Sequence, residues 1–229
     1  MKAKNFYQTF ADTLPVLAGY LFLGGGFGIL LAEKGYTALW AGGMALTMFA
    51  GSGQYLAVSL LSGGAGLLTA AVATFLVNAR HIFYGISLLD VYKDAPGKAY
   101  MIFGLTDETY TLVTMKQPPQ GLSRHTYCLW VTLLNHIYWI CGCILGAIAG
   151  TVLPINFQGV EFVLTALFVT MFVEQWTSVR HHLPALIGVA STILCLTLFG
   201  KEIFLIPSMA LIALLLIVME KAARRQTHA

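Results

Sequence analysis

Long apolar runs recur along the whole chain, and they constrain its fold more than any other feature. Each run is close to the roughly 20 residues that an α-helix needs to cross the hydrocarbon core of a bilayer. The seven runs are Leu14–Ala32, Ala38–Leu61, Ala65–Leu89, Tyr127–Leu153, Val160–Val179, Leu183–Phe199 and Ile203–Met219. The sequence therefore predicts an all-α, polytopic integral membrane protein with seven transmembrane helices.

The composition supports a membrane protein independently of these runs. Of the 229 residues, 58% are hydrophobic and only 10% are charged, which leaves too little polar surface for a soluble domain of this size. The loops between the runs are short and contain glycine or proline, as at Ser62–Gly64 and Pro154–Asn156. We expect a single transmembrane domain that covers residues 1–229.

The number of spans has two solutions, because the segment Ala99–Met115 is apolar at its start but carries Asp107 and Glu108 near its centre. The basic residues of the tail, Lys221, Arg224 and Arg225, predict a cytoplasmic C-terminus. Seven spans place nine Lys and Arg residues inside and three outside, whereas eight spans place eight inside and four outside. The charge distribution fixes the side of the C-terminus and leaves the count at seven or eight.

Two glycine clusters interrupt predicted spans, at Gly24–Gly28 and at Gly51–Gln54. A glycine costs a helix interior up to about 1 kcal/mol relative to alanine, so either cluster favours local unwinding or close packing between helices. We expect packing at the first cluster, which has no polar side chain. At the second we expect a break that binds a ligand, formed by Gly51, Ser52, Gly53, Gln54 and Tyr55.

The third run contains an arginine and a histidine, in the sequence Asn78-Ala79-Arg80-His81. A charged side chain facing lipid at this depth costs about 2.5 to 3.5 kcal/mol, so Arg80 should face protein, water or a ligand. On a continuous helix, Asn78 and His81 share a stripe with small residues, and Arg80 forms an i, i+4 pair with Tyr84. For Arg80 the alternatives are an ion pair with Asp107 or Glu108, or snorkelling toward a membrane interface. For Asn78 the alternative is an interhelical hydrogen bond, and for His81 a core position.

These groups suit an amino acid as the ligand. A zwitterion needs a cation or N–H groups for its carboxylate and acceptors for its ammonium group, which Asn78, Arg80 and His81 supply together with the Gly51–Gln54 backbone. Asp107, Glu108 and Glu174 are intramembrane acids and therefore candidates for proton coupling. Glu174 has an equally good interpretation as a carboxylate at the membrane interface. Asn135-His136 and Glu174-Gln175 are further polar pairs at or within spans.

Three motifs in this order and spacing resemble the AzlC family of branched-chain amino acid permeases. They are Phe49-Ala50-Gly51-Ser52-Gly53-Gln54-Tyr55, Asn78-Ala79-Arg80-His81-Ile82-Phe83-Tyr84-Gly85 and Leu105-Thr106-Asp107-Glu108-Thr109-Tyr110. The resemblance implies export of valine, leucine, isoleucine and in some cases methionine across a bacterial inner membrane. It also implies a small membrane partner of the AzlD type, which is not fused to this chain.

Other functions fit the sequence less well. A passive channel for small zwitterions is the main alternative, although no repeated filter motif occurs, and an intramembrane enzyme would need a nucleophile with a base or a metal set. No cofactor is expected. No metal site is expected either, because neighbouring histidines such as His181 and His182 point in different directions from a helix and do not converge on one ion. A short echo of Met48–Tyr55 in Met171–Trp176 suggests an inverted repeat.

Overall fold

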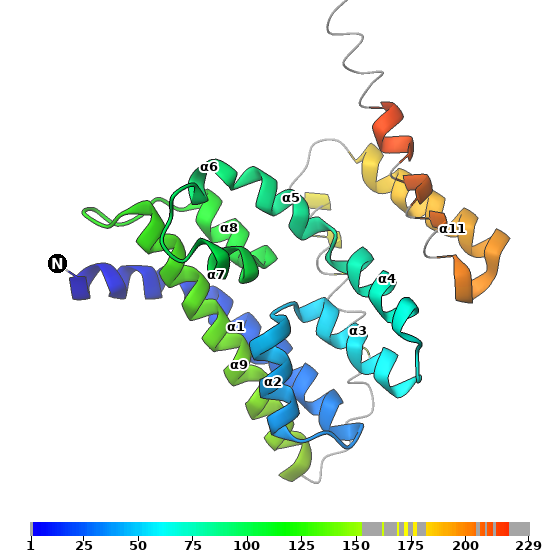
Figure 1. The fold of residues 1–229 in the computed structure, drawn as a ribbon, viewed down its shortest axis with the longest axis horizontal. Helices are drawn as coiled ribbons and strands as arrows, with labels where there is room; N and C mark the ends of the chain where they lie inside the picture. The colour runs from blue at the N-terminus through cyan, green and yellow to red at the C-terminus, as the bar shows by residue number, and fades with distance from the viewer. Residues whose placement is uncertain are drawn as a thin grey trace, which may run out of the picture. The chain divides into compact units, whose positions relative to one another are not determined.

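The computed structural model describes residues 2–152 and 182–204 and parts of 162–177 and 207–219, and all the regular elements in this part of the chain are helices. The helices are α1 (Lys2–Glu33), α2 (Ala38–Met48), α3 (Gly51–Ser62), α4 (Leu67–Asn78), α5 (Arg80–Ser87), α6 (Leu89–Tyr92), α7 (Lys98–Phe103), α8 (Asp107–Met115), α9 (Arg124–Val152) and α11 (Leu183–Ile203). They fall into two compact units, residues 1–165 and 166–229. The candidate site lies in the first unit, shown in Figure 1 with α1 to α9.

The two long helices of the first unit, α1 and α9, lie side by side and run in the same direction (Figure 1). Near their starts, the Tyr127 hydroxyl donates to the Asp12 carboxylate at 3.2 Å. Near their ends, Gly150 packs against Ala32. Because neither helix is interrupted, together they form the frame against which the shorter helices are placed.

Small residues let these two helices approach closely. A Cβ atom on Gly28 would overlap the carbonyl oxygen of Cys143, and one on Gly146 would overlap the backbone of Gly25. The packing expected for Gly24–Gly28 is therefore confirmed, and the expected interruption of the first span is wrong, since α1 is continuous through this cluster. Contact between backbones replaces the missing side chains and offsets the low helix propensity of glycine.

The predicted span Ala38–Leu61 is wrong as a single helix, because the chain breaks at Phe49–Ala50 and turns back. Helix α2 runs opposite to α9. Gly42 packs against Ile144 of α9, and Phe49, at the end of α2, stacks on His136 with the ring centroids 4.4 Å apart. Phe49 has φ 22° and Ala50 is extended, which ends one helix and starts the next. The glycines at Gly51 and Gly53 form the first turn of α3 rather than an unwound loop.

Helix α3 runs back along the α1/α9 pair, in the direction opposite to that of α2. The Tyr55 hydroxyl donates to the Leu23 carbonyl oxygen at 2.7 Å, and the Tyr55 ring packs edge-on against Phe27. These contacts lie closer to the end of α1 than Tyr20, whose ring packs against Phe49 in the α2–α3 break. Helices α2 and α3 therefore form a hairpin that enters from one end of the α1/α9 pair and leaves by the same end.

The third predicted span, Ala65–Leu89, is split at Ala79 into α4 and α5, which meet at a bend of 44°. The expected stripe on a continuous helix is therefore wrong beyond Asn78, since His81 lies on the second helix. Helix α4 packs against α3, with the Asn78 side chain next to Gly53. Helix α5 leads away from that point toward α8, where Ser87 donates to the Tyr110 hydroxyl at 3.1 Å.

The segment Ala99–Met115 forms a second hairpin and not a helix long enough to be an eighth span. Before α7, Gly97 lies against Leu129 near the start of α9, and Thr109 in α8 meets Asn135 further along α9. After α8, the chain is back at the start of α9, where Arg124 donates to the Lys116 carbonyl oxygen at 2.7 Å. This hairpin enters from the end of the α1/α9 pair opposite to the first.

Each hairpin has its own apolar core. One core is built around α1, α2, α3 and the second half of α9 and includes Phe27, Tyr55 and Cys143. The other joins α6, α7, α8 and the first half of α9 and includes Tyr92, Met101 and Val131. The polar groups described below lie between these two cores.

Three helices in the described part are long and apolar enough to cross a bilayer, namely α1, α9 and α11, and α4 with α5 makes a fourth if the pair is one span. This agrees with a polytopic membrane protein, but it does not confirm seven or eight spans. The predicted span Val160–Val179 lies largely outside the described residues, as does half of the segment Met171–Trp176 on which the inverted repeat rested. The predicted span Ile203–Met219 is described in part, and it is helical at residues 207–208, 210–212 and 214–219.

Candidate functional site

The three helix breaks of the first unit meet at one place, halfway along α1 and α9. A Cβ atom on Gly104, in the α7–α8 break, would lie 3.5 Å from the Phe49 ring of the α2–α3 break. Arg80, which begins α5 after the third break, contacts Ser52 on α3. Helix termini with unused backbone N–H and C=O groups are thus gathered around one small region.

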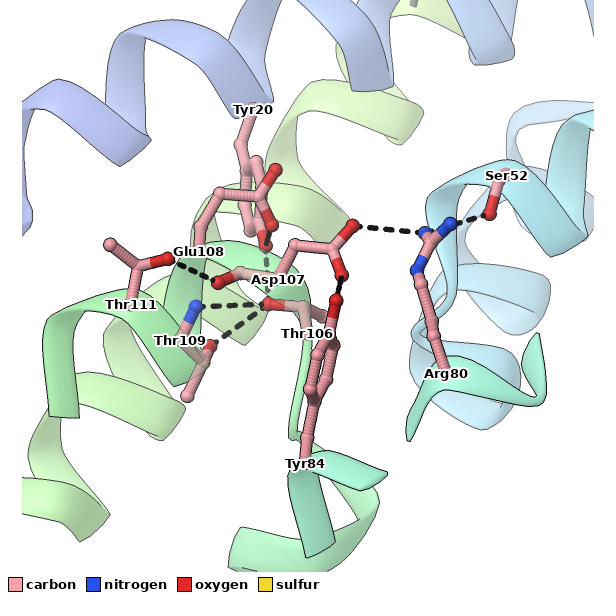
Figure 2. A network of polar contacts seen from close by, with 9 residues as sticks. All are labelled: Tyr20, Ser52, Arg80, Tyr84, Thr106, Asp107, Glu108, Thr109 and Thr111. Carbon is pink, nitrogen blue, oxygen red and sulfur yellow. Dashed lines mark hydrogen bonds and ion pairs between the residues drawn. The ribbon is translucent and has the colours of Figure 1, made fainter. Parts of the chain in front are cut away.

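Arg80 connects the two hairpins across this region (Figure 2). Its Nη2 atom lies 2.9 Å from Asp107 Oδ2 on α8 and donates to Ser52 Oγ on α3 at 3.3 Å. The alternative of an ion pair is therefore confirmed for Asp107 and not for Glu108. Both charged side chains are 29% exposed, while Arg80 Nε is buried without a hydrogen-bond partner. The guanidinium is held in place with part of its donor capacity unused.

Asp107 and Glu108 occupy the first turn of α8, where the partial positive charge of a helix N-terminus favours carboxylates. Thr106 caps this turn by accepting a hydrogen bond from the Thr109 N–H at 3.2 Å. Tyr84 donates to Asp107 Oδ1 at 2.7 Å, so the i, i+4 pair of Arg80 and Tyr84 converges on one carboxylate. The capped turn fixes both acids relative to α5.

Glu108 points away from Arg80, toward α1. The Tyr20 hydroxyl donates to Glu108 Oε2 at 2.7 Å and also lies 2.7 Å from Thr106 Oγ1 (Figure 2). From Thr106 the hydrogen bonds continue through Thr109 to Asn135 on α9. The two neighbouring acids therefore have different surroundings: Asp107 is paired with a cation, and Glu108 belongs to a network of neutral hydroxyl and amide groups.

The first turn of α3 faces an aromatic side chain. The Trp139 ring lies against Gly51, and its Nε1 atom donates to Gln54 Oε1 at 2.5 Å. Gln54 is fully buried, and its Nε2 atom has no hydrogen-bond partner among the described residues. Of the predicted Gly51–Tyr55 set, Gln54 and Tyr55 thus tie α3 to the long helices, whereas Ser52 faces Arg80.

Asn78 and His81 flank the break between α4 and α5. Asn78 donates to the Thr74 carbonyl oxygen of its own helix at 2.9 Å rather than across helices, and its buried Oδ1 atom has no partner. His81 is half-buried, and its ring packs edge-on against Tyr84 at 5.7 Å. Asn78 therefore places an unused acceptor beside Gly53, and His81 borders the Arg80–Tyr84 pair.

Several residues of this region were not predicted as site residues from the sequence. Tyr20 and Trp139 lie inside apolar runs and give no pattern that separates them from core aromatics. The sequence identifies His136 only as a polar residue within a span. Its Nε2 atom lies 3.2 Å from the Ala45 carbonyl oxygen, and its Nδ1 atom lies 2.9 Å from the Tyr100 hydroxyl. The remaining predicted acid, Glu174, lies outside the described residues.

Residues 15–153 match the family model described as AzlC protein. The chain belongs to the AzlC family. It is 39% identical, over 94% of its length and 85% of the relative's, to the branched-chain amino acid transport protein AzlC of Bacillus subtilis. It is 38% identical to a membrane protein of Helicobacter pylori, over 95% of this chain and 96% of that one. It is 26% identical to the inner membrane protein YgaZ of Escherichia coli, over 75% of this chain and 74% of that one. No solved structure matches this chain.

Membership of the AzlC family identifies the chain as a membrane transport protein rather than an enzyme. The matched residues 15–153 contain α2 to α9, and therefore the whole junction of the three helix breaks. The resemblance drawn from the three sequence motifs is thus confirmed, and the motifs contribute the residues that meet at this junction.

Proposed function

We propose that this AzlC-family chain is a secondary transporter that exports the branched-chain amino acids valine, leucine and isoleucine, with methionine as a further substrate. The name of the Bacillus subtilis relative supports this substrate class. The single observation that carries the proposal is the position of Arg80, a partly exposed cation at the point where three broken helices meet. Broken helices around a central charged group are typical of substrate sites in secondary transporters.

In this proposal the substrate carboxylate binds between Arg80 and the first turn of α3. The first N–H groups of a helix have no partner within the helix, so those of Gly51, Ser52 and Gly53 are suited to an anion. Arg80 adds a planar set of donors that matches a carboxylate. Ser52 Oγ already lies at 3.3 Å from Arg80, which places the side-chain donor beside the helix terminus.

Proton coupling is the second part of the proposal, with Glu108 as the proton carrier among the candidate acids Asp107, Glu108 and Glu174. Asp107 is engaged by Arg80 at 2.9 Å, so its charge is already balanced by an ion pair. Glu108 has no cation beside it in the described part of the chain and accepts its hydrogen bond from the neutral Tyr20. Transfer of a proton to Glu108 would therefore remove a charge that is not balanced by an ion pair.

Flux into proteoliposomes tests the transporter against the alternative of a passive channel. The chain is purified from the native membrane together with any partner that it retains and is reconstituted, and uptake of labelled leucine is followed with and without an imposed proton gradient. A proton-coupled transporter accumulates leucine above its external concentration when the gradient is present, whereas a channel only equalises the two concentrations. Arg80→Ala should abolish uptake, and Lys93→Ala, which removes an exposed cation before α7, should retain it.

We further propose that the chain works in the bacterial inner membrane with its C-terminus in the cytoplasm and with a small hydrophobic partner of the AzlD type. The described first unit is small for a transporter, and many large apolar side chains on α4 and α5 are exposed, including Leu67, Phe75 and Phe83. Co-purification from the native membrane tests for the partner. Transport by the chain alone after stringent purification would contradict the need for one.

A further inference from the structure

We infer that the substrate enters the site by opening the Arg80–Asp107 ion pair, with its carboxylate on Arg80 and its ammonium group on Asp107. This inference rests on the proposed function and assigns Asp107 to the substrate rather than to proton coupling. Asp107 then engages the guanidinium group that would bind the substrate carboxylate, and Arg80 engages the carboxylate that would bind the ammonium group.

The geometry of the pair suits such an exchange. The contact joins Nη2 of Arg80 to Oδ2 of Asp107 at 2.9 Å, and Arg80 Nε has no hydrogen-bond partner. The Nε side of the guanidinium fork, which can take part in bidentate contacts with carboxylates, is therefore not used in this pair. Both side chains are 29% exposed, so a solute can reach them without unfolding the surrounding helices.

Charge balance explains why a zwitterion opens the pair and a singly charged solute does not. A free carboxylate that displaced Asp107 would leave that side chain as an unpaired charge in a region of low dielectric constant, which is unfavourable. An α-amino acid carries both charges a few ångströms apart and satisfies Arg80 and Asp107 together. Tyr84, which donates to Asp107 Oδ1 at 2.7 Å, holds the carboxylate in position throughout the exchange.

The exchange also links binding to a change in structure. Arg80 joins Ser52 of the first hairpin to Asp107 of the second, so the ion pair ties the two hairpins together directly. A substrate inserted between Arg80 and Asp107 replaces this direct contact with a longer bridge. Asn78 Oδ1 on α4, buried beside Gly53 of the first hairpin without a partner, provides a second acceptor for the ammonium group.

Binding of three related solutes to the full-length chain tests the inference. The solutes are leucine, 4-methylpentanoate, which lacks the amino group, and 3-methylbutylamine, which lacks the carboxylate. Calorimetry should show that the unchanged protein binds leucine at least about tenfold more tightly than either analogue. In Asp107→Asn, leucine should bind about ten- to a hundredfold more weakly, while 4-methylpentanoate should bind more tightly because Arg80 is no longer occupied.

Two further variants make the test independent of the folding of Asp107→Asn. Arg80→Gln frees Asp107 and should raise the affinity for 3-methylbutylamine relative to leucine. Asp107→Glu keeps the charge and should keep the preference for leucine over both analogues. Asp90→Asn, a substitution of an exposed acid on α6, serves as the matched control and should leave all three affinities unchanged.

The outcomes separate this inference from the proposed function. If the unchanged protein transports leucine, but Asp107→Asn and Arg80→Gln leave both leucine-to-analogue ratios as they were, Asp107 does not bind the ammonium group and the inference is overturned. If the unchanged protein neither binds nor transports leucine, the proposed substrate is wrong and the inference fails with it.

Discussion

At the residue scale, the charges of the site are stabilised by neighbours that come from different helices. Arg80 on α5 is paired with Asp107 on α8 and contacts Ser52 on α3, while Tyr20 on α1 holds Glu108. Each charged group thus has a polar partner at hydrogen-bonding distance, which is the requirement for keeping it in an apolar environment. The same arrangement makes the charges sensitive to movements of the helices that carry them.

Arg80 should contribute to leucine binding through the planar geometry of its guanidinium group as well as through its charge. Arg80→Lys keeps a cation but loses the planar fork, so leucine should bind more weakly, and Arg80→Ala should weaken binding further. Loss of one charge-assisted contact corresponds to about 1.5 to 3 kcal/mol, or about ten- to a hundredfold in affinity. Calorimetry on folded, monodisperse protein measures this effect. If Arg80→Ala binds leucine with unchanged affinity, the arginine has a structural role only.

Glu108 should be needed for coupling but not for substrate exchange. Glu108→Gln keeps an acceptor for the Tyr20 hydroxyl and removes the group that would carry the proton. Gradient-driven leucine uptake should therefore be lost, while exchange of internal for external leucine should continue, because exchange needs no net proton movement. Measurement of both modes in the same vesicles gives the comparison. Equal loss of the two would indicate a structural role for this carboxylate.

Some of the site was predictable from the sequence, and the reason differs from residue to residue. Arg80 and Asp107 were predicted because a charge inside an apolar run is costly and rare. Tyr20 and Trp139 were not, because an aromatic side chain in an apolar run has the same pattern whether it fills a core or holds a polar group. Only the fold shows that Tyr20 reaches Glu108 and that Trp139 reaches Gln54.

At the scale of the elements, the lengths of the short helices match half of a bilayer. Helix α2 has 11 residues and α3 has 12, and at about 1.5 Å per residue each spans roughly half of a 30 Å hydrocarbon core. The sequence showed the run Ala38–Leu61 as one span because hydropathy does not record a reversal of direction. The reversal needs only Phe49 with a positive φ and an extended Ala50.

The contact between α1 and α9 should depend on the absence of one particular side chain. A methyl group on Gly28 would overlap backbone atoms of Cys143 and Ala147, neither of which can rotate away. Overpacking of this kind costs typically 1 to 3 kcal/mol, so Gly28→Ala should lower the melting temperature in detergent. Gly25→Ala is the matched control, since a Cβ atom there meets nothing within 4 Å. Equal melting temperatures for the two variants would show that the helices adjust freely.

At the scale of the whole molecule, the first unit crosses the membrane three times: twice in one direction, with α1 and α9, and once in the opposite direction. Helices α1 and α9 are parallel, so the chain between them must return an odd number of times across the membrane. The two hairpins each return to the end from which they started, so the α4–α5 pair makes this return. With the three apolar runs that follow residue 153, this arrangement predicts six spans rather than the seven or eight obtained from hydropathy.

The positive charges support this topology independently of the contacts. With six spans, both termini are cytoplasmic, and ten basic residues lie inside: Lys2, Lys4, Lys93, Lys98, Lys116, Arg124, Arg180, Lys221, Arg224 and Arg225. Only Lys34 and Lys201 lie outside, and Arg80 lies in the site. This division of ten against two is more asymmetric than nine against three for seven spans or eight against four for eight.

Labelling of single cysteines in intact cells should separate these topologies. In a chain with its native cysteines replaced, Lys34→Cys precedes the first hairpin and Ser62→Cys follows it, and both positions are exposed. A hairpin places them on the same side, so a membrane-impermeant maleimide should label both from outside, whereas Gln120→Cys should be labelled only after the membrane is opened. Labelling of Lys34→Cys alone would mean that α2 and α3 cross the bilayer together, and the six-span arrangement would then be wrong. Leucine transport by each variant in proteoliposomes confirms that the labelled protein is folded.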